Sequence, residues 1–146
     1  RTAALDAEFA KGTMKKVIQQ TATWDEAEAK KIVESVINSG EKFNVIYAEN
    51  DGMAKGAVAA LDEAGITHGV KGDVIVMGFD CNKWALRELL AGNWNYDGQC
   101  SPFQAAVIEN MIKTGKVTSK KVISEEKGFD AKTITKADID TYGLGD

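Results

Sequence analysis

The sequence predicts an α/β fold with three layers, α/β/α, and a mostly parallel sheet. Short apolar runs alternate with helical patterns of roughly ten to fifteen residues, and glycine or proline falls at the ends of these patterns. Strands that are joined through helices form right-handed crossovers, which place them in parallel. With 146 residues, of which 44% are hydrophobic, the chain has material for one core.

The first elements lie before residue 40. Residues 2–11 read as a helix, and the segment KKVIQQTATW over 15–24 predicts a strand. Thr23 with Glu26 three residues later forms a capping box, which predicts that a second helix begins there. The apolar face of that helix contains Ala29, Ile32, Val33, Val36 and Ile37.

Three strands are predicted in the middle of the chain: NVIYA over 44–48, VIVMGF over 74–79 and WNYDGQ over 94–99. A helical pattern follows each of them. The first of these helices has Asp51 as its expected cap and ends at Gly65. Its expected core residues are Met53, Ala54, Ala57, Val58 and Leu61.

The next helix covers 82–92, and the one after it begins at Ser101 and Pro102 and ends at Gly115. The tail departs from this alternation. Residues 120–126 read as a further strand, and a capping box that begins at Thr135 predicts a short final helix.

Composition excludes several classes of function. The net charge is −4 and the charges are interspersed, so we expect no nucleic acid partner. The sequence contains no run of about eighteen apolar residues, so we expect no transmembrane segment in it. Cys81 and Cys100 form no CxxC pair, so the sequence does not support zinc binding or thioredoxin-type chemistry. We expect no metal and no cofactor.

The sequence also lacks the signatures of common enzymes. It contains no GxGxxG motif, no phosphate loop and no GxSxG elbow. The lone histidine, His68, reads as a solvated loop residue. Asp51 and Asp80 could form an acid–base pair, yet nothing in the sequence sets their pKa values apart. We therefore expect that the protein is not an enzyme.

Polar and aromatic residues follow the predicted strands. In an open parallel sheet the carboxyl ends of the strands share one edge, and ligands bind there. At these positions lie Trp24, Asn50, Asp80 and the pair Gln99 and Cys100. An indole packs on the apolar face of a sugar ring, while planar carboxylate and amide groups bind neighbouring hydroxyls. These residue types at one edge predict carbohydrate binding.

The same residues also have structural interpretations. Asn50 or Asp51 can cap the helix that follows, and for Asp51 we favour the cap. Asp80 can fix its own turn, although Asn82 is better placed to cap the next helix, which leaves Asp80 for a ligand. Trp24 can cover the end of the core.

The segments YAENDGMAKGA and VMGFD, together with WALRELLAGNWNYDGQCSP, resemble the C-terminal lobe of the type I periplasmic sugar-binding proteins, the solute receptors of ABC transporters. Ribose-, galactose- and galactofuranose-binding members are the most similar. The resemblance covers nearly the whole chain. It implies a Rossmann-like lobe over residues 1–146, a sugar ligand and a permease partner. It also implies a periplasmic or extracellular location, with a lipid anchor as one option.

The resemblance assigns roles to single residues. Asn50 and Asp80 match the main hydroxyl partners of the family, and Trp24 stands where relatives often stack Phe on the sugar. Arg1 matches an arginine that reaches the sugar in relatives, although Ala4 and Leu5 replace the usual Gly and Phe beside it.

Two positions depart from the family pattern. Cys100 stands where relatives often have a glutamine that contacts the sugar, and Gln99 comes one residue earlier. Cys81 replaces a glycine of the family after the GFD turn. Because both cysteines are expected at the ligand edge, we hypothesise that they can form a disulfide.

The family has a second, N-terminal lobe that completes the pocket and closes over the solute. By this resemblance, the first strand of the lobe precedes Arg1, and about residues 101–118 pack on the other lobe. We therefore expect the fragment to dimerise, to swap elements or to have a perturbed sheet.

Two rival functions share this fold. One is the effector-binding domain of a lactose-repressor-type transcription regulator, and the other is the ectodomain of a membrane sensor. A secretion signal, a helix-turn-helix or a transmembrane helix next to this chain would separate the three.

Overall fold

The computed structural model describes residues 1–100, 104–116 and 125–145. The helices are α1 Thr2–Phe9, α2 Glu26–Asn38, α3 Asp51–Glu63, α4 Lys83–Ala91, α5 Gln104–Thr114 and α6 Lys136–Tyr142, with a 3-10 turn η1 at Gly69–Lys71. The strands are β1 Val45–Tyr47, β2 Ile75–Asp80, β3 Tyr96–Gln99 and β4 Gly128–Asp130.

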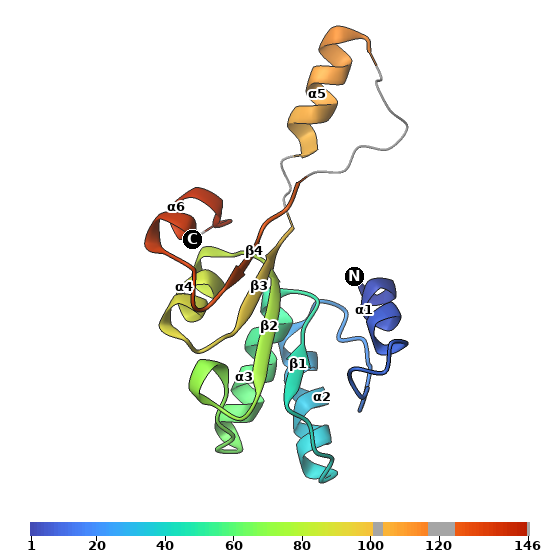
Figure 1. Ribbon diagram of the computed structural model, residues 1–146, viewed down its shortest axis with the longest axis vertical. Coiled ribbons are helices and arrows are strands. Elements are labelled where there is room, and N and C mark those ends of the chain that lie inside the picture. The colour runs from blue at the N-terminus through green and yellow to red at the C-terminus, as the bar shows by residue number, and fades with distance from the viewer. Residues whose placement is uncertain (101–103, 117–124, 146) are drawn as a thin grey trace.

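The four strands form one sheet in the order β1-β2-β3-β4 (Figure 1). β1, β2 and β3 are parallel, whereas β4 runs antiparallel to β3. α3 lies between β1 and β2 in the chain, and α4 lies between β2 and β3. The prediction of an α/β fold with a mostly parallel sheet is confirmed.

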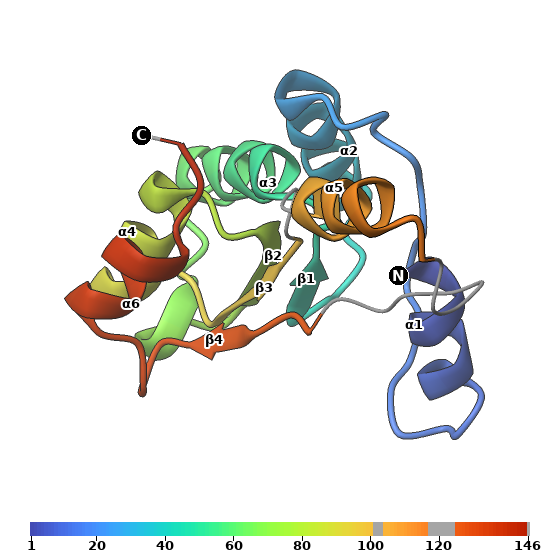
Figure 2. The same cartoon turned by 90° about the horizontal axis from the view of Figure 1, so that it is seen from above.

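Helices cover the sheet in groups. α2 packs on α3, which contacts β1 and β2, while α4 contacts β3 and α6. Figure 2 shows α2 and α3 together on one side of the sheet, and α4 with α6 near β3 and β4. The core between them contains the buried side chains of Leu61, Val74, Val76, Leu86, Leu89 and Trp94.

The contact between α2 and α3 is close because Gly56 lies in it. A Cβ atom at Gly56 would collide with the carbonyl oxygen of Glu26. Glycine therefore lets the two helix backbones approach, and the ion pair of Lys55 with Glu26 at 3.1 Å flanks the contact.

The predicted strand over 15–24 is wrong, since residues 15–22 form neither helix nor strand. Strand pairing needs a neighbour, and among the described residues β1 is hydrogen-bonded along one edge only, to β2. Val17 and Ile18 instead line a shallow hollow beside Val36 of α2. The sheet thus lacks one expected strand.

The start of α2 also differs from the prediction. Asp25, not Thr23, caps α2, and its carboxylate accepts a hydrogen bond from the backbone N–H of Glu28 at 2.8 Å. Thr23 and Trp24 have φ of 49° and 61°, so the chain makes a left-handed turn before the helix can begin.

The remaining helix ends follow the sequence signals. Gly65, Gly92 and Gly115 have positive φ after α3, α4 and α5. The capping box at the start of α6 is present, with Thr135 and Asp138 each accepting from the backbone N–H of the other.

The tail strand is displaced from its expected place. β4 lies at Gly128–Asp130, and residues 120–124 of the predicted strand are outside the described residues. The expected helix start at Ser101 and Pro102 is outside them too. In the described part of the chain, no helix has both the length and the apolar character needed to cross a membrane.

Candidate functional site

The candidate site lies where β1, β2 and β3 end. Asp80, the last residue of β2, is in register with Gln99, the last residue of β3. Glu49 and Asn50 follow β1, which pairs with β2. This edge, called the rim below, therefore gathers three of the predicted turns, as expected for a parallel sheet.

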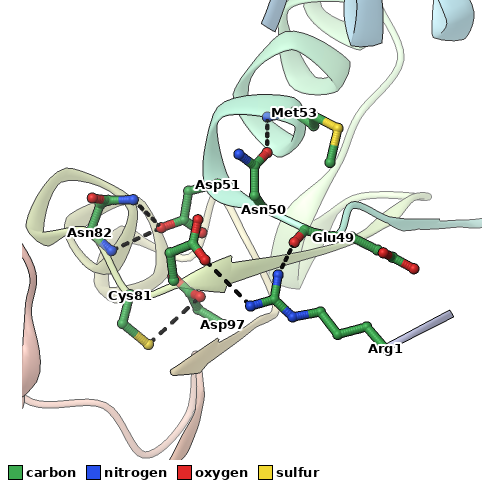
Figure 3. A network of polar contacts seen from close by, with 9 residues as sticks. Arg1, Glu49, Asn50, Asp51, Met53, Cys81, Asn82 and Asp97 are labelled. Carbon is green, nitrogen blue, oxygen red and sulfur yellow. Dashed lines mark hydrogen bonds and ion pairs between the residues drawn. The ribbon is translucent and has the colours of Figure 1, made fainter. Parts of the chain in front are cut away.

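Arg1 joins two of these turns (Figure 3). Its guanidinium donates to the carbonyl oxygen of Glu49, and its Nη2 lies 3.5 Å from Oδ1 of Asp80. The guanidinium carbon lies 4.7 Å from the centre of the Phe79 ring. Thr2 adds a 2.5 Å hydrogen bond to the Glu49 carboxylate. The start of α1 thus lies on the rim.

Asp80 occupies a half-open position. Its side chain is 31% exposed, and partial burial raises its pKa above the ordinary value while Arg1 opposes that rise. Asp80 and Cys81 have φ of 113° and 60°, which L-residues rarely adopt. This strained turn keeps the Asp80 carboxylate next to Arg1.

Asn50, not Asp51, caps α3. The Asn50 side chain caps α3, accepting from the backbone N–H of Met53 at 2.8 Å. The cap predicted at Asp51 is wrong, because its Oδ2 accepts from the backbone N–H and the amide of Asn82, at 2.8 and 2.9 Å. Asn82 therefore makes no side-chain cap for α4.

Asp97 is a site residue that the sequence prediction missed. It lies in β3 with no exposed surface, and its Oδ1 accepts from the Cys81 thiol at 3.7 Å. Burial is the main cause that raises the pKa of Asp51 to about 6 and that of Asp97 to about 8. The negative charge of Asp51 is the next cause that raises the pKa of Asp97. A charged residue within an otherwise uncharged strand was the available signal.

The rest of the predicted site is less tightly joined. The side chain of Gln99 accepts from the backbone N–H of Lys127 at 3.3 Å and is thus engaged toward the chain before β4. Trp24 is 74% exposed, and among the described residues no hydrogen bond or ring contact joins it to Asn50 or Asp80.

The disulfide hypothesis is wrong for this structure. Cys81 and Cys100 are both free, the first buried and the second exposed. Burial raises the pKa of the Cys81 thiol well above its usual range, so Cys81 remains a neutral donor to Asp97.

A second polar cluster lies at the opposite edge of the sheet. His68 is only 12% exposed, so its prediction as a solvated residue is wrong. Its ring nitrogens contact the Asn93 carbonyl at 2.8 Å and the Asp62 carboxylate at 3.0 Å, beside a hollow of about 430 Å³. Within the described ranges, no group of three or more His, Cys, Asp or Glu residues is arranged to hold a metal ion.

Relatives of the chain are named for sugar import. The D-apiose import binding protein of Actinobacillus succinogenes is 42% identical over 79 residues, which are 54% of this chain and 24% of that protein. The fructose import binding protein FruE of Bifidobacterium longum is 32% identical over 123 residues, 81% of this chain and 36% of that protein. The chain thus spans about a quarter to a third of these relatives.

Solved structures show the same fold. The binding protein of the arabinose ABC transporter from Shewanella sp. ANA-3, bound to L-arabinofuranose, has a TM-score of 0.80 and 24% identity, covering 97% of this chain and 48% of that one. A solute-binding protein from Actinobacillus succinogenes with bound D-allose has a TM-score of 0.77 and 25% identity, covering 95% and 48%.

The family comparison covers most of the chain. Residues 1–106, which include the rim and β1 to β3, match the family described as "Periplasmic binding protein domain". The fold, the named relatives and this match agree. The chain belongs to the periplasmic binding protein family.

Proposed function

We propose that the chain is the C-terminal lobe, over residues 1–146, of the solute-binding protein of an ABC transporter. It binds a monosaccharide-like sugar in the cleft between two lobes and delivers it to a permease, without catalysing a reaction. The observation that carries this proposal is the rim, where Arg1 contacts Asp80 at the end of β2 and Asn50 follows the neighbouring strand β1. Family membership and the sugar import names of relatives support it.

The rim has the chemistry for a pair of hydroxyls. Arg1 only donates, and ionised Asp80 only accepts. Their contact at 3.5 Å is longer than a strong charged hydrogen bond. A sugar hydroxyl can therefore accept from Arg1 and donate to Asp80. Asn50 uses its Oδ1 for the cap, and no described residue accepts from its amide nitrogen, which can therefore donate to a second hydroxyl.

Stacking on Trp24 completes the proposed contact set, with Gln99 and Cys100 at its border. The indole is 74% exposed, which suits a group that covers one face of a sugar ring. In this proposal the facing lobe supplies the remaining contacts, and closure of the two lobes traps the solute.

The surface of α5 supports the lobe assignment. Ile108 and Ile112 are 57% and 76% exposed on this helix. Large apolar side chains on one exposed helix suit a segment, about 101–118, that packs on another lobe. In isolation the chain is expected to associate through such surfaces or through the free edge of β1.

The proposed location is periplasmic or extracellular, with lipid anchoring as one form of it. Transport is favoured over the alternative of a lactose-repressor-type effector domain because the named relatives are import binding proteins.

A thermal-shift screen of the intact two-lobed protein against monosaccharides and disaccharides tests the proposal. A monosaccharide should raise the melting temperature, and Asp80→Ala should weaken its binding roughly 10- to 100-fold, the cost of one hydrogen bond to a charged group. Asp140→Ala, at an exposed position of α6, is the matched control and should bind normally. Stabilisation only by an amino acid or a nucleoside would overturn the sugar assignment.

A further inference from the structure

Two buried oxygen atoms beneath the rim have no hydrogen-bond partner among the residues that the structure describes. They are Oδ1 of Asp51 and Oδ2 of Asp97, and neither residue has any exposed surface. The other oxygen of each carboxyl is occupied, by Asn82 on Asp51 and by Cys81 on Asp97. Unpaired buried oxygens are costly, so this arrangement requires an explanation.

Both carboxyl residues lie next to Gly78: Oδ1 of Asp51 is 2.7 Å from the position that a Cβ of Gly78 would take, and Asp97 is in register with Gly78 on the neighbouring strand. One proton between the unpaired oxygens would satisfy both atoms at once, since one carboxyl would donate and the other accept. We propose that Asp51 and Asp97 share a single proton at neutral pH, and that its loss to solvent in alkaline solution loosens the rim. The second half of this inference rests on the proposed function.

Asp97 is the member that carries the proton. Asp51 receives two N–H donors from Asn82, which stabilise its charged form, whereas Asp97 receives a weak thiol donor at 3.7 Å. The pKa values, about 6 for Asp51 and about 8 for Asp97, have this order. Protonated Asp97 Oδ2 then donates to Oδ1 of Asp51.

The surrounding groups do not neutralise a second charge. Asp51 lies on α3 and Asp97 on β3, while Asp80 at the end of β2 and the neutral thiol of Cys81 after it lie nearby. The guanidinium of Arg1 is engaged with Asp80 on the rim. Deprotonated Asp97 would therefore repel the charge of Asp51, which Asp80 already repels.

The pair is connected to the rim through short links. Asp51 follows Asn50 directly, and its carboxylate holds Asn82, two residues after Asp80 (Figure 3). Repulsion between Asp51 and Asp97 thus acts on the turn that carries Asp80 and on the first turn of α3. Solute affinity should fall in the same pH range in which the proton is lost.

The direction of the pH dependence follows from the pKa shifts. Both folded pKa values are raised above 3.8, so the folded chain holds more protons than the unfolded chain. The stability that these two protons contribute is fully present below pH 3.8, and it is lost as pH rises through 6 and then 8. Between these two pH values the folded chain holds one proton more than the unfolded chain. The equilibrium constant of unfolding therefore rises about tenfold per pH unit.

The test is urea unfolding of the intact two-lobed protein at several pH values, with Asp97→Asn as the variant. An amide at position 97 replaces the protonated carboxyl, since it donates to Asp51 and accepts from Cys81. The variant should lose the tenfold-per-unit dependence between pH 6 and 8, whereas Asp140→Asn, on exposed α6, should keep it. Equal slopes in Asp97→Asn and the unchanged chain would overturn the proposal.

Infrared spectroscopy provides a measurement that needs no variant. At pH 7 the unchanged chain should show the C=O stretch of a buried protonated carboxyl, and this band should disappear as pH rises above about 8. A spectrum without such a band at pH 7 would refute the shared proton. Failure to bind any sugar would refute only the proposed function, because both measurements are made without solute.

Discussion

The carboxylate at the rim and the two carboxyls beneath it have the same chemistry but opposite surroundings. Asp80 is 31% exposed and lies beside Arg1. Asp97 is fully buried, and it is in register with Gly78, which precedes Asp80 by two residues in β2. Asp51 is buried with it and is bound by Asn82. The difference fits two tasks in the proposed function: the exposed Asp80 contacts the solute, and the inner pair fixes the turn that carries Asp80.

The largest effect on stability is expected from Asp51→Ala. The backbone N–H and the amide of Asn82 would lose their acceptor inside the protein, which costs about 3 kcal/mol. Urea unfolding at pH 5, where repulsion within the inner pair is weak, measures the loss. Asp80→Ala should change the unfolding free energy by less than about 1 kcal/mol. Equal losses in the two variants would remove the distinction between rim and inner carboxylates.

Gly78→Ala tests how tightly the inner pair is enclosed. The added Cβ would lie 2.7 Å from Oδ1 of Asp51 and 2.7 Å from the Trp94 ring, so overpacking should cost about 2 kcal/mol. Because Trp94 is buried, its fluorescence should change as well.

Gly52→Ala is the matched control for this substitution. Its Cβ would meet only the Asn50 side chain, at 3.8 Å, within the first turn of α3. Better helix propensity should then stabilise the chain by up to about 1 kcal/mol. Two changes of the same sign would contradict the expected crowding at Gly78.

A smaller effect than that of Asp51→Ala or Gly78→Ala is expected from the two helix caps. Asn50→Ala and Asp25→Ala each remove one cap hydrogen bond of 2.8 Å and should each cost about 1 kcal/mol. Only Asn50→Ala should also weaken solute binding in the intact protein, as titration calorimetry would show. If both variants bind the solute equally well, Asn50 only caps α3 and does not contact the solute.

Most of the fold could be predicted because strands and helices carry local signals. The apolar run at 74–79 and the glycines after three helices mark elements that the structure contains. The segment over 15–24 has a strand pattern without a partner strand, and no local signal reports that. β4 was missed because it is three residues long and only Phe129 in it is buried.

The candidate site was predicted in part. The order of strands brings Asp80 and Asn50 to one edge, and this follows from topology alone. Asp51 and Asn82 both follow strands and both resemble caps, so the sequence does not show that they bind each other. Asp97 depends on burial by neighbouring elements, which strand periodicity does not reveal.

The close approach of α2 and α3 at Gly56 has a consequence for how selectivity can change. α2 begins just after Trp24, and α3 begins just after Asn50, so their spacing sets the distance between indole and amide. A larger side chain at position 56 would separate the helices and widen that distance. If the chain binds a sugar as proposed, its preference for one sugar over another can therefore be altered from within this helix interface, by a residue away from the rim.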